Sequence, residues 1–205
     1  FVHWDQLGIE TVGKAIHKQF APYLQPTEDI KYVKETYCNN INYLGPNKWY
    51  DAGDKRFHPD NIISDVRVLN TLFIIDKQTG DIVWRIGPDF EATKELQEIG
   101  QIVGQHHVHM IPRGLPGEGN ILLFDNGGQA GVGKPTPCCP TGFNNATRSY
   151  SRVLEINPVT LKVEWAFNDE KFHFHNSGER AFNDLLFSEY CSSADRLPNG
   201  NTLIT

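Results

Sequence analysis

The chain lacks any hydrophobic run long enough to cross a membrane. Of its 205 residues, 39% are hydrophobic and 21% are charged, which is typical of a globular protein with a buried core. The longest apolar runs, residues 71–75 and 120–124, have the length of β-strands. Because a membrane helix needs about 20 apolar residues, no membrane span is predicted.

The chain also lacks an excess of basic residues. Nineteen lysines and arginines face 25 aspartates and glutamates, so the formal net charge is −6. Binding to nucleic acid needs a concentrated basic surface, and a nucleic-acid partner is therefore excluded. The chain starts at Phe1 without a methionine, and we interpret it as a processed or truncated product.

Cysteine is scarce. The four residues Cys38, Cys138, Cys139 and Cys191 fit no zinc-binding spacing, since adjacent Cys138 and Cys139 cannot easily provide two tetrahedral ligands. An even number of cysteines and the Asn-Ala-Thr sequon at 145–147 favour an exported protein, periplasmic or extracellular, with one or two disulfides. Cys138 and Cys139 are expected to staple a loop, with Cys38 or Cys191 as a partner.

Two segments repeat the same pattern. Residues 72–84 and 152–165 each read as a strand, a tight turn that begins with Asp or Asn, and a second strand that ends in tryptophan. Turn residues between alternating apolar positions predict β-hairpins. Trp84 and Trp165 hold equivalent positions in the two repeats and are expected to pack between neighbouring units.

A second repeated element, a polar turn followed by an apolar strand, stands before each hairpin position. It occurs at residues 59–67, 111–124 and 196–204. Joined to the hairpins, these elements predict four-stranded blades, so the fold class is all-β and the architecture a β-propeller. About three blades are visible in this chain.

The whole chain, 1–205, is expected to be one partial propeller domain. Residues 88–104 and 127–149 are expected to be loops, the first with a short helix. The boundaries are approximate: a helical insertion or blade connection at about 1–30, and blade segments at about 31–87, 105–167 and 190–205.

Several motifs occur in a fixed order along the chain. They are TGDIVWRIG at 79–87, QH at 105–106, NILLFDNG at 120–127, SRV at 151–153 and LPNGNTL at 197–203. This ordered set resembles the bacterial arylsulfate sulfotransferase family. The resemblance implies a six-bladed propeller that moves a sulfuryl group from an aryl sulfate to a phenolic acceptor through a sulfohistidine, without PAPS or another cofactor. No phosphate-binding glycine motif is present, which agrees with this implication.

The resemblance assigns His106 as the nucleophile that becomes sulfated. A neutral imidazole is a good nucleophile near pH 7, and its sulfated form can pass the group on. Arg67 matches the family's arginine that holds the sulfuryl oxygens, where a guanidinium stabilises negative charge in the transition state.

Further site residues follow from the same resemblance. Asn39 matches the family's asparagine, and Ser192 or Ser193 matches a hydroxyl donor to the substrate. Tyr37 stands where the family usually has a histidine, which changes how protons are handled. His107 is a candidate for lining the substrate site.

Other interpretations remain open from the residues. The histidines at 106, 107 and 109 could bind a metal in a metal-dependent enzyme. On a regular strand, His107 and His109 share one face and His106 lies on the other, so a three-histidine site needs a bulge. Arg67 could instead pair with Asp65 or Asp76.

The chain could also be a ligand-binding or structural propeller that has no catalytic activity. In either case the partners are small molecules, an aryl sulfate and a phenol for the enzyme. The remaining blades are expected from further sequence or from another chain, for example in a homo-oligomer.

Overall fold

The computed structural model describes residues 38–128, 148, 150–168, 186–188 and 190–205. The helical elements in this part are short: α2 (Lys48–Asp51), α3 (Lys94–Ile99) and the 3₁₀ helices η4 (Lys55–Phe57) and η5 (Arg67–Leu69). Within the described residues, no helix is long and apolar enough to span a membrane. The N-terminal insertion predicted at about 1–30 lies outside the described residues.

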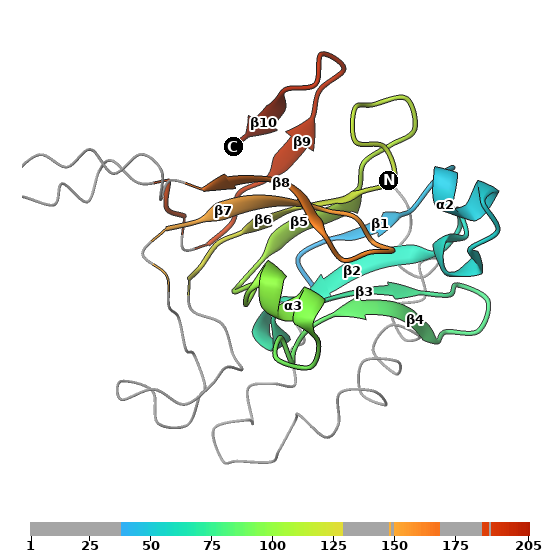
Figure 1. Cartoon of the computed structure of the whole chain (residues 1–205), viewed down its shortest axis with the longest axis horizontal. Helices are drawn as coiled ribbons and strands as arrows, with labels where there is room; N and C mark the ends of the chain where they lie inside the picture. The colour runs from blue at the N-terminus through green and yellow to red at the C-terminus, as the bar shows by residue number, and fades with distance from the viewer. Residues whose placement is uncertain (1–37, 129–147, 149, 169–185, 189) are drawn as a thin grey trace, which may run out of the picture.

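Antiparallel strands dominate the structure. They are β1 (Ile41–Tyr43), β2 (Ile62–Val66), β3 (Thr71–Ile75), β4 (Ile82–Ile86), β5 (His106–Met110), β6 (Ile121–Asp125), β7 (Arg152–Ile156), β8 (Val163–Asn168), β9 (Ala194–Arg196) and β10 (Thr202–Ile204). They form two four-stranded sheets, β1-β2-β3-β4 and β5-β6-β7-β8, and a two-stranded sheet of β9 and β10 (Figure 1). The all-β prediction is therefore confirmed, while a closed propeller ring is not seen in the described part of the chain.

The two predicted hairpins are present and have the same turn. In β3–β4, Ile74 pairs with Trp84, and Asp76 Oδ1 accepts hydrogen bonds from the backbone N–H groups of residues 78 and 79. In β7–β8, Glu155 pairs with Trp165, and Asn157 Oδ1 accepts from residues 159 and 160. An Asp or Asn that binds its own turn backbone explains why both turns form locally.

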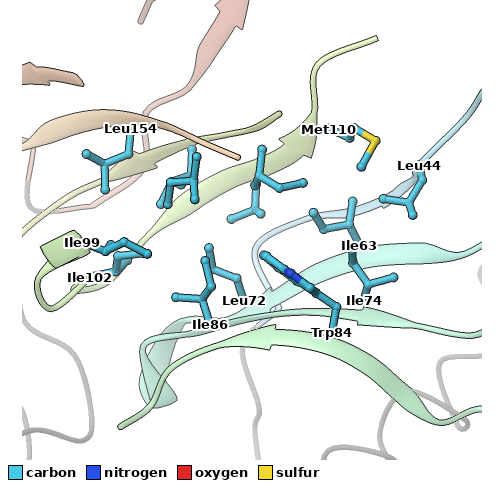
Figure 2. Close-up of a cluster of buried hydrophobic side chains, with 14 of the residues drawn as sticks. Leu44, Ile63, Leu72, Ile74, Trp84, Ile86, Ile99, Ile102, Met110 and Leu154 are labelled. Carbon is cyan, nitrogen blue, oxygen red and sulfur yellow. The ribbon is translucent and has the colours of Figure 1, made fainter. Parts of the chain in front are cut away.

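The main core lies between the two four-stranded sheets. Figure 2 shows side chains of both sheets, and of Ile99 and Ile102 beside α3, meeting in this layer. Trp84 is buried there, and its Nε1 donates to the Pro158 carbonyl in the β7–β8 turn at 2.7 Å. Trp84 therefore packs between the two sheets as expected from its repeated position. Trp165 differs, since 36% of its surface is exposed, and Arg196 lies 5.7 Å from its ring.

The opposite face of the second sheet packs against the third. Leu122, Phe124 and Val153 form a buried cluster with Ile111 and with Ala194 of β9. Both faces of β6 are therefore covered, and all five of its residues are buried. This arrangement places the start of β5, the end of β6 and the segment before β9 close together.

Candidate active site

The strand β5 contains a β-bulge at its histidines. His106 pairs with Phe124 and His109 with Leu122, so three steps along β5 match two along β6. His107 has φ = 52°, in the left-handed region. Since Phe124 and Leu122 share one face of β6, the register puts His106 and His109 on one face. In a regular strand His106 and His109 would lie on opposite faces, and the bulge brings them to the same face because it breaks the period of two.

The imidazole of His106 is held through one nitrogen. Its Nδ1 lies 2.7 Å from Asn126 Oδ1 and 3.0 Å from the Gly104 carbonyl oxygen. Asn126 comes directly after β6 and is completely buried. Its Nδ2 donates to the carbonyl oxygens of Ser188 at 2.8 Å and Cys191 at 2.6 Å.

These contacts determine the tautomer of His106. Because Asn126 Nδ2 donates to two carbonyls, the oxygen of that amide must face the imidazole. Both neighbours of Nδ1 are then acceptors, so Nδ1 carries the proton. In the neutral ring, Nε2 is therefore the nitrogen with a lone pair, as a nucleophile or a general base requires.

The surroundings favour the neutral ring. Burial lowers the pKa of His106 below its ordinary value, and the nearby positive charge of Arg67 lowers it further. The hydrogen bonds from Nδ1 to Asn126 and Gly104 raise the pKa and oppose part of this effect. At neutral pH the His106 imidazole is consequently uncharged.

Arg67 brings a positive charge to this place. It begins η5, directly after β2, and a Cβ built on Gly104 would lie 3.7 Å from its Nη2. Gly104 has φ = 66°, which favours glycine, and its carbonyl contacts His106. The Tyr190 ring lies 5.2 Å from the Arg67 guanidinium carbon. The structure therefore brings Arg67 and His106 close together, while their roles in sulfuryl transfer stay predictions.

A buried carboxylate fixes the loop that leads into β5. Asp125 is completely buried and accepts from the backbone N–H of Val103 at 2.8 Å and from Arg152 Nε at 2.7 Å. Arg148 also forms an ion pair with it, at 2.6 Å. Arg152 in turn donates to three consecutive carbonyls, those of residues 99–101. The turn from α3 to His106 is thereby tied to the end of β6.

Asn39 lies beside β5 but acts on its backbone. Its Nδ2 donates to the Gln105 carbonyl at 2.8 Å. Asn40 behaves in the same way, since its side chain binds both the N–H and the carbonyl of Val108. The asparagines before β1 thus support the strand that carries His106. Tyr37 lies outside the described residues.

The other predicted substrate residues lie near β9. Ser193 Oγ hydrogen-bonds Thr205 Oγ1 at 2.8 Å. Ser192 has φ = 102° and follows Cys191, whose φ is also positive at 63°. This backbone conformation is uncommon for residues other than glycine, and it occurs where the Cys191 carbonyl binds Asn126. In the segment 191–193, it is therefore the Cys191 backbone that contacts the His106 site, through Asn126.

His107 and His109 form a separate pair. Their ring centres are 4.6 Å apart, and His107 Nδ1 lies 3.0 Å from the Ala194 carbonyl oxygen. His107 Nε2 is 3.9 Å from Asp195 Oδ1. The bulge needed for a three-histidine site exists, yet among the described residues no group of three or more His, Cys, Asp or Glu could hold a metal.

Two of the four cysteines are described. Cys38 and Cys191 are both free thiols, so the disulfides considered for them are not formed. Burial, and then the charge of Asp65, raises the pKa of the Cys38 thiol to about 11. Cys138 and Cys139 lie outside the described residues.

Asn126 is the functional candidate that sequence reasoning missed. The Asp-Asn-Gly sequence at 125–127 is typical of a turn, because Asn-Gly favours positive φ. A signal was available, since three polar or small residues directly follow the apolar run 120–124. Such residues end a buried strand, so their side chains can point into the protein instead of into solvent.

The chain was compared with known proteins. The sequence model of a family described as Arylsulfotransferase (ASST) matches residues 48–205. This range contains His106, Arg67 and Asn126 and begins after Asn39. No curated protein and no solved structure matches the chain.

Proposed function

Because the chain belongs to the arylsulfotransferase (ASST) family, we propose that it moves a sulfuryl group from an aryl sulfate to a phenol through a sulfated His106. The observation that carries the proposal is the contact of His106 Nδ1 with Asn126. It leaves Nε2 as the nucleophilic nitrogen of a neutral ring.

In the first half-reaction, His106 Nε2 attacks the sulfur of the aryl sulfate. The N–S bond forms while the S–O bond to the aryl group breaks, and the phenolate departs and takes a proton from solvent. The ring then carries a positive charge, and its Nδ1–H donates hydrogen bonds to Asn126 Oδ1 and the Gly104 carbonyl. These fixed acceptors stabilise the charge without rearrangement.

In the second half-reaction, a phenol oxygen attacks the same sulfur. The N–S bond breaks, a new S–O bond forms, and the phenol loses its proton, so His106 returns to its neutral form. In the first step negative charge develops on the departing phenolate oxygen, and in both steps the sulfuryl oxygens carry negative charge. We propose that the Arg67 guanidinium, whose positive charge lies near His106, stabilises the charge on the sulfuryl oxygens.

The architecture that we propose around this site is a propeller. The two four-stranded sheets are consecutive meanders that pack face to face, and Trp84 connects them through its hydrogen bond to Pro158. The β9–β10 pair, which follows the second sheet in the chain, packs on the face of that sheet that points away from the first sheet. These features support the interpretation of the sheets as neighbouring blades.

The test uses the full chain with 4-nitrophenyl sulfate as donor and phenol as acceptor. We expect nitrophenol release that depends on phenol, and a mass increase of one sulfuryl group on the peptide with His106 when phenol is withheld. His106→Ala should abolish both signals, while His58→Ala, at a partly exposed position outside this site, should change neither. No release from folded wild-type protein would contradict the proposal and favour a binding protein.

A further inference from the structure

Next to His106, two buried polar groups are incompletely paired. Asp65 of β2 and Gln105, the residue before β5, are both fully buried. Gln105 Nε2 donates to Asp65 Oδ2 at 3.2 Å and to the Thr71 carbonyl at 3.3 Å. Asp65 Oδ1 and Gln105 Oε1 are buried and accept no hydrogen bond of good geometry, although the amides of Asn39 and Asn40 lie close enough to Asp65 to favour its ionised form.

Asp65 Oδ1 and Gln105 Oε1 are both acceptors when Asp65 is ionised. A buried acceptor without a donor is costly, and a buried carboxylate is more costly still. A proton on Asp65 Oδ1 removes the charge and provides a hydrogen-bond donor. The unpaired Oε1 of the adjoining Gln105 is then available as its acceptor. A carboxylic acid and a primary amide can exchange two hydrogen bonds in this way.

This pair is connected to the reacting residue through the backbone. Gln105 directly precedes His106, and its carbonyl accepts from Asn39 Nδ2 at 2.8 Å. Its side chain is anchored to β2 and β3 through Asp65 and the Thr71 carbonyl. Fixing Gln105 at both its side chain and its carbonyl fixes the position from which the His106 side chain starts.

Few charged groups surround Asp65. Leu72 lies opposite it on β3, and the segment before β1 contributes the Cys38 thiol. Arg67 follows two residues later, and His106 is next to Gln105. Burial raises the pKa of Asp65 to about 7, although amide groups of Asn39, Asn40 and Gln105 lower it in part. The group is therefore set to change its protonation near neutral pH.

We infer that Asp65 is a positioning residue whose protonated carboxyl group holds Gln105 and thereby sets the position of His106. The inference rests on the proposed function for its effect on sulfuryl transfer. Ionisation of Asp65 removes the proton that Oδ1 offers to Gln105 Oε1 and leaves both buried oxygens as acceptors, so the way in which the pair holds Gln105 changes. Activity should then fall on the alkaline side as Asp65 loses its proton.

The first experiment follows protonation directly and needs no activity. In the full chain with ¹³C-labelled aspartate, the Asp65 carboxyl signal should titrate near neutral pH, and the His106 ring signals should shift at the same pH. In Asp65→Asn, this second shift should disappear. The amide can make the same two hydrogen bonds as the protonated acid but cannot ionise.

The second experiment measures the pH profile of sulfuryl transfer. Asp65→Ala should lower kcat by about tenfold or more, and Asp65→Asn should restore most of that loss and remove the alkaline decrease. Gln105→Leu should remove the alkaline decrease as well, with a lower kcat at all pH values. Asp60→Asn, an exposed carboxylate, is the matched control and should keep the wild-type profile.

Two results would overturn the inference. One is an Asp65 carboxyl signal that titrates in the ordinary range of aspartate, near pH 4. The other is a His106 response that is unchanged in Asp65→Asn. If the titrations behave as expected but the protein transfers no sulfuryl group, the proposed function fails and the coupling of Asp65 to His106 stands.

Discussion

At the scale of single residues, the protonation state of His106 depends on whether its hydrogen-bond partners are donors or acceptors. Asn126 has its amide nitrogen committed to two carbonyls, so its oxygen is the only atom that it can offer to His106. An aspartate at this position would still accept from Nδ1 but would add a negative charge. The identity of residue 126 therefore sets the charge of the His106 ring as well as its orientation.

Asn126→Asp is expected to raise the pKa of His106, because an opposite charge favours the imidazolium. Transfer needs the neutral ring, so the loss of kcat/KM at acidic pH should begin at a higher pH than in the wild type. The lost donors to Ser188 and Cys191 should also reduce kcat/KM by about tenfold or more at its optimum. The pH dependence of kcat/KM measures both effects.

Asn199→Asp is the control for that change, since Asn199 lies in the β9–β10 turn and its side chain accepts a hydrogen bond from the turn backbone at Asn201. The decrease of kcat/KM at acidic pH in Asn199→Asp should begin at the same pH as in the wild type. An unshifted acid limb in Asn126→Asp would show that Asn126 does not determine the protonation of His106.

The residues of the site differ in how far the sequence could predict them. His106 and Arg67 were predicted from a resemblance, and the structure brings them together. Asn126 and Gln105 were not recognised as members of the site, because their roles depend on burial and on a partner at least 20 positions away. Sequence patterns report local periodicity, and such distant pairings do not appear in them.

At the scale of elements, local chemistry explains what could be predicted. The hairpins β3–β4 and β7–β8 were predicted because Asp76 and Asn157 form their turns within four residues. The short helix in 88–104 was also predicted, and α3 begins after Thr93, which caps it. The bulge in β5 was not predicted, since it depends on pairing with β6 and no glycine marks it.

The connection from α3 to β5 depends on Asp125. Asp125→Ala is expected to lower the free energy of unfolding by about 3 kcal/mol, because two partly buried arginines and the Val103 N–H lose their acceptor. Urea denaturation measures this loss. Activity of the folded variant should also fall, since the loop before His106 is no longer held.

Asp54→Ala offers a comparison for Asp125→Ala. Asp54 also pairs with an arginine, but the Arg56 pair is exposed to solvent. Exposed pairs contribute at most about 1 kcal/mol. Equal destabilisation by the two variants would rule out a special contribution of the buried Asp125.

At the scale of the whole molecule, Trp84 contributes to the contact between the two large sheets through both packing and a hydrogen bond. Trp84→Ala should destabilise the protein by about 3–5 kcal/mol, because it creates a cavity and leaves the Pro158 carbonyl without its donor. Trp165→Ala, the equivalent position of the other repeat, should cost about 1 kcal/mol in this chain since its ring is partly exposed. Thermal and urea unfolding of both variants would reveal whether the two repeats differ in this way.

The pH dependence of stability follows from the buried carboxyl of Asp65. Its folded pKa, about 7, is higher than the unfolded value, so between about pH 4 and 7 the folded state binds more protons. Its contribution to stability is therefore present at low pH and is lost as the pH rises through this window, with a slope of up to about 1.4 kcal/mol per pH unit.

His106 and His109 act in the opposite direction, because burial lowers the pKa of each. The difference in unfolding free energy between wild type and Asp65→Asn isolates the aspartate. This difference should change steadily from pH 4 to 7 in favour of the variant. A difference that is independent of pH would mean that Asp65 is ionised throughout that range.

The bulge in β5 also bears on how this strand can change during evolution. Because three steps on β5 face two on β6, deleting one residue between His106 and His109 would restore regular alternation and turn one end of the strand over. Either His106 would exchange sides with Gln105, or Met110 would leave the core. Point substitutions in β5 can be compensated by neighbours, whereas a change of its length cannot. Relatives that keep the reaction should therefore vary in the length of their loops but have no insertions or deletions between residues 105 and 110.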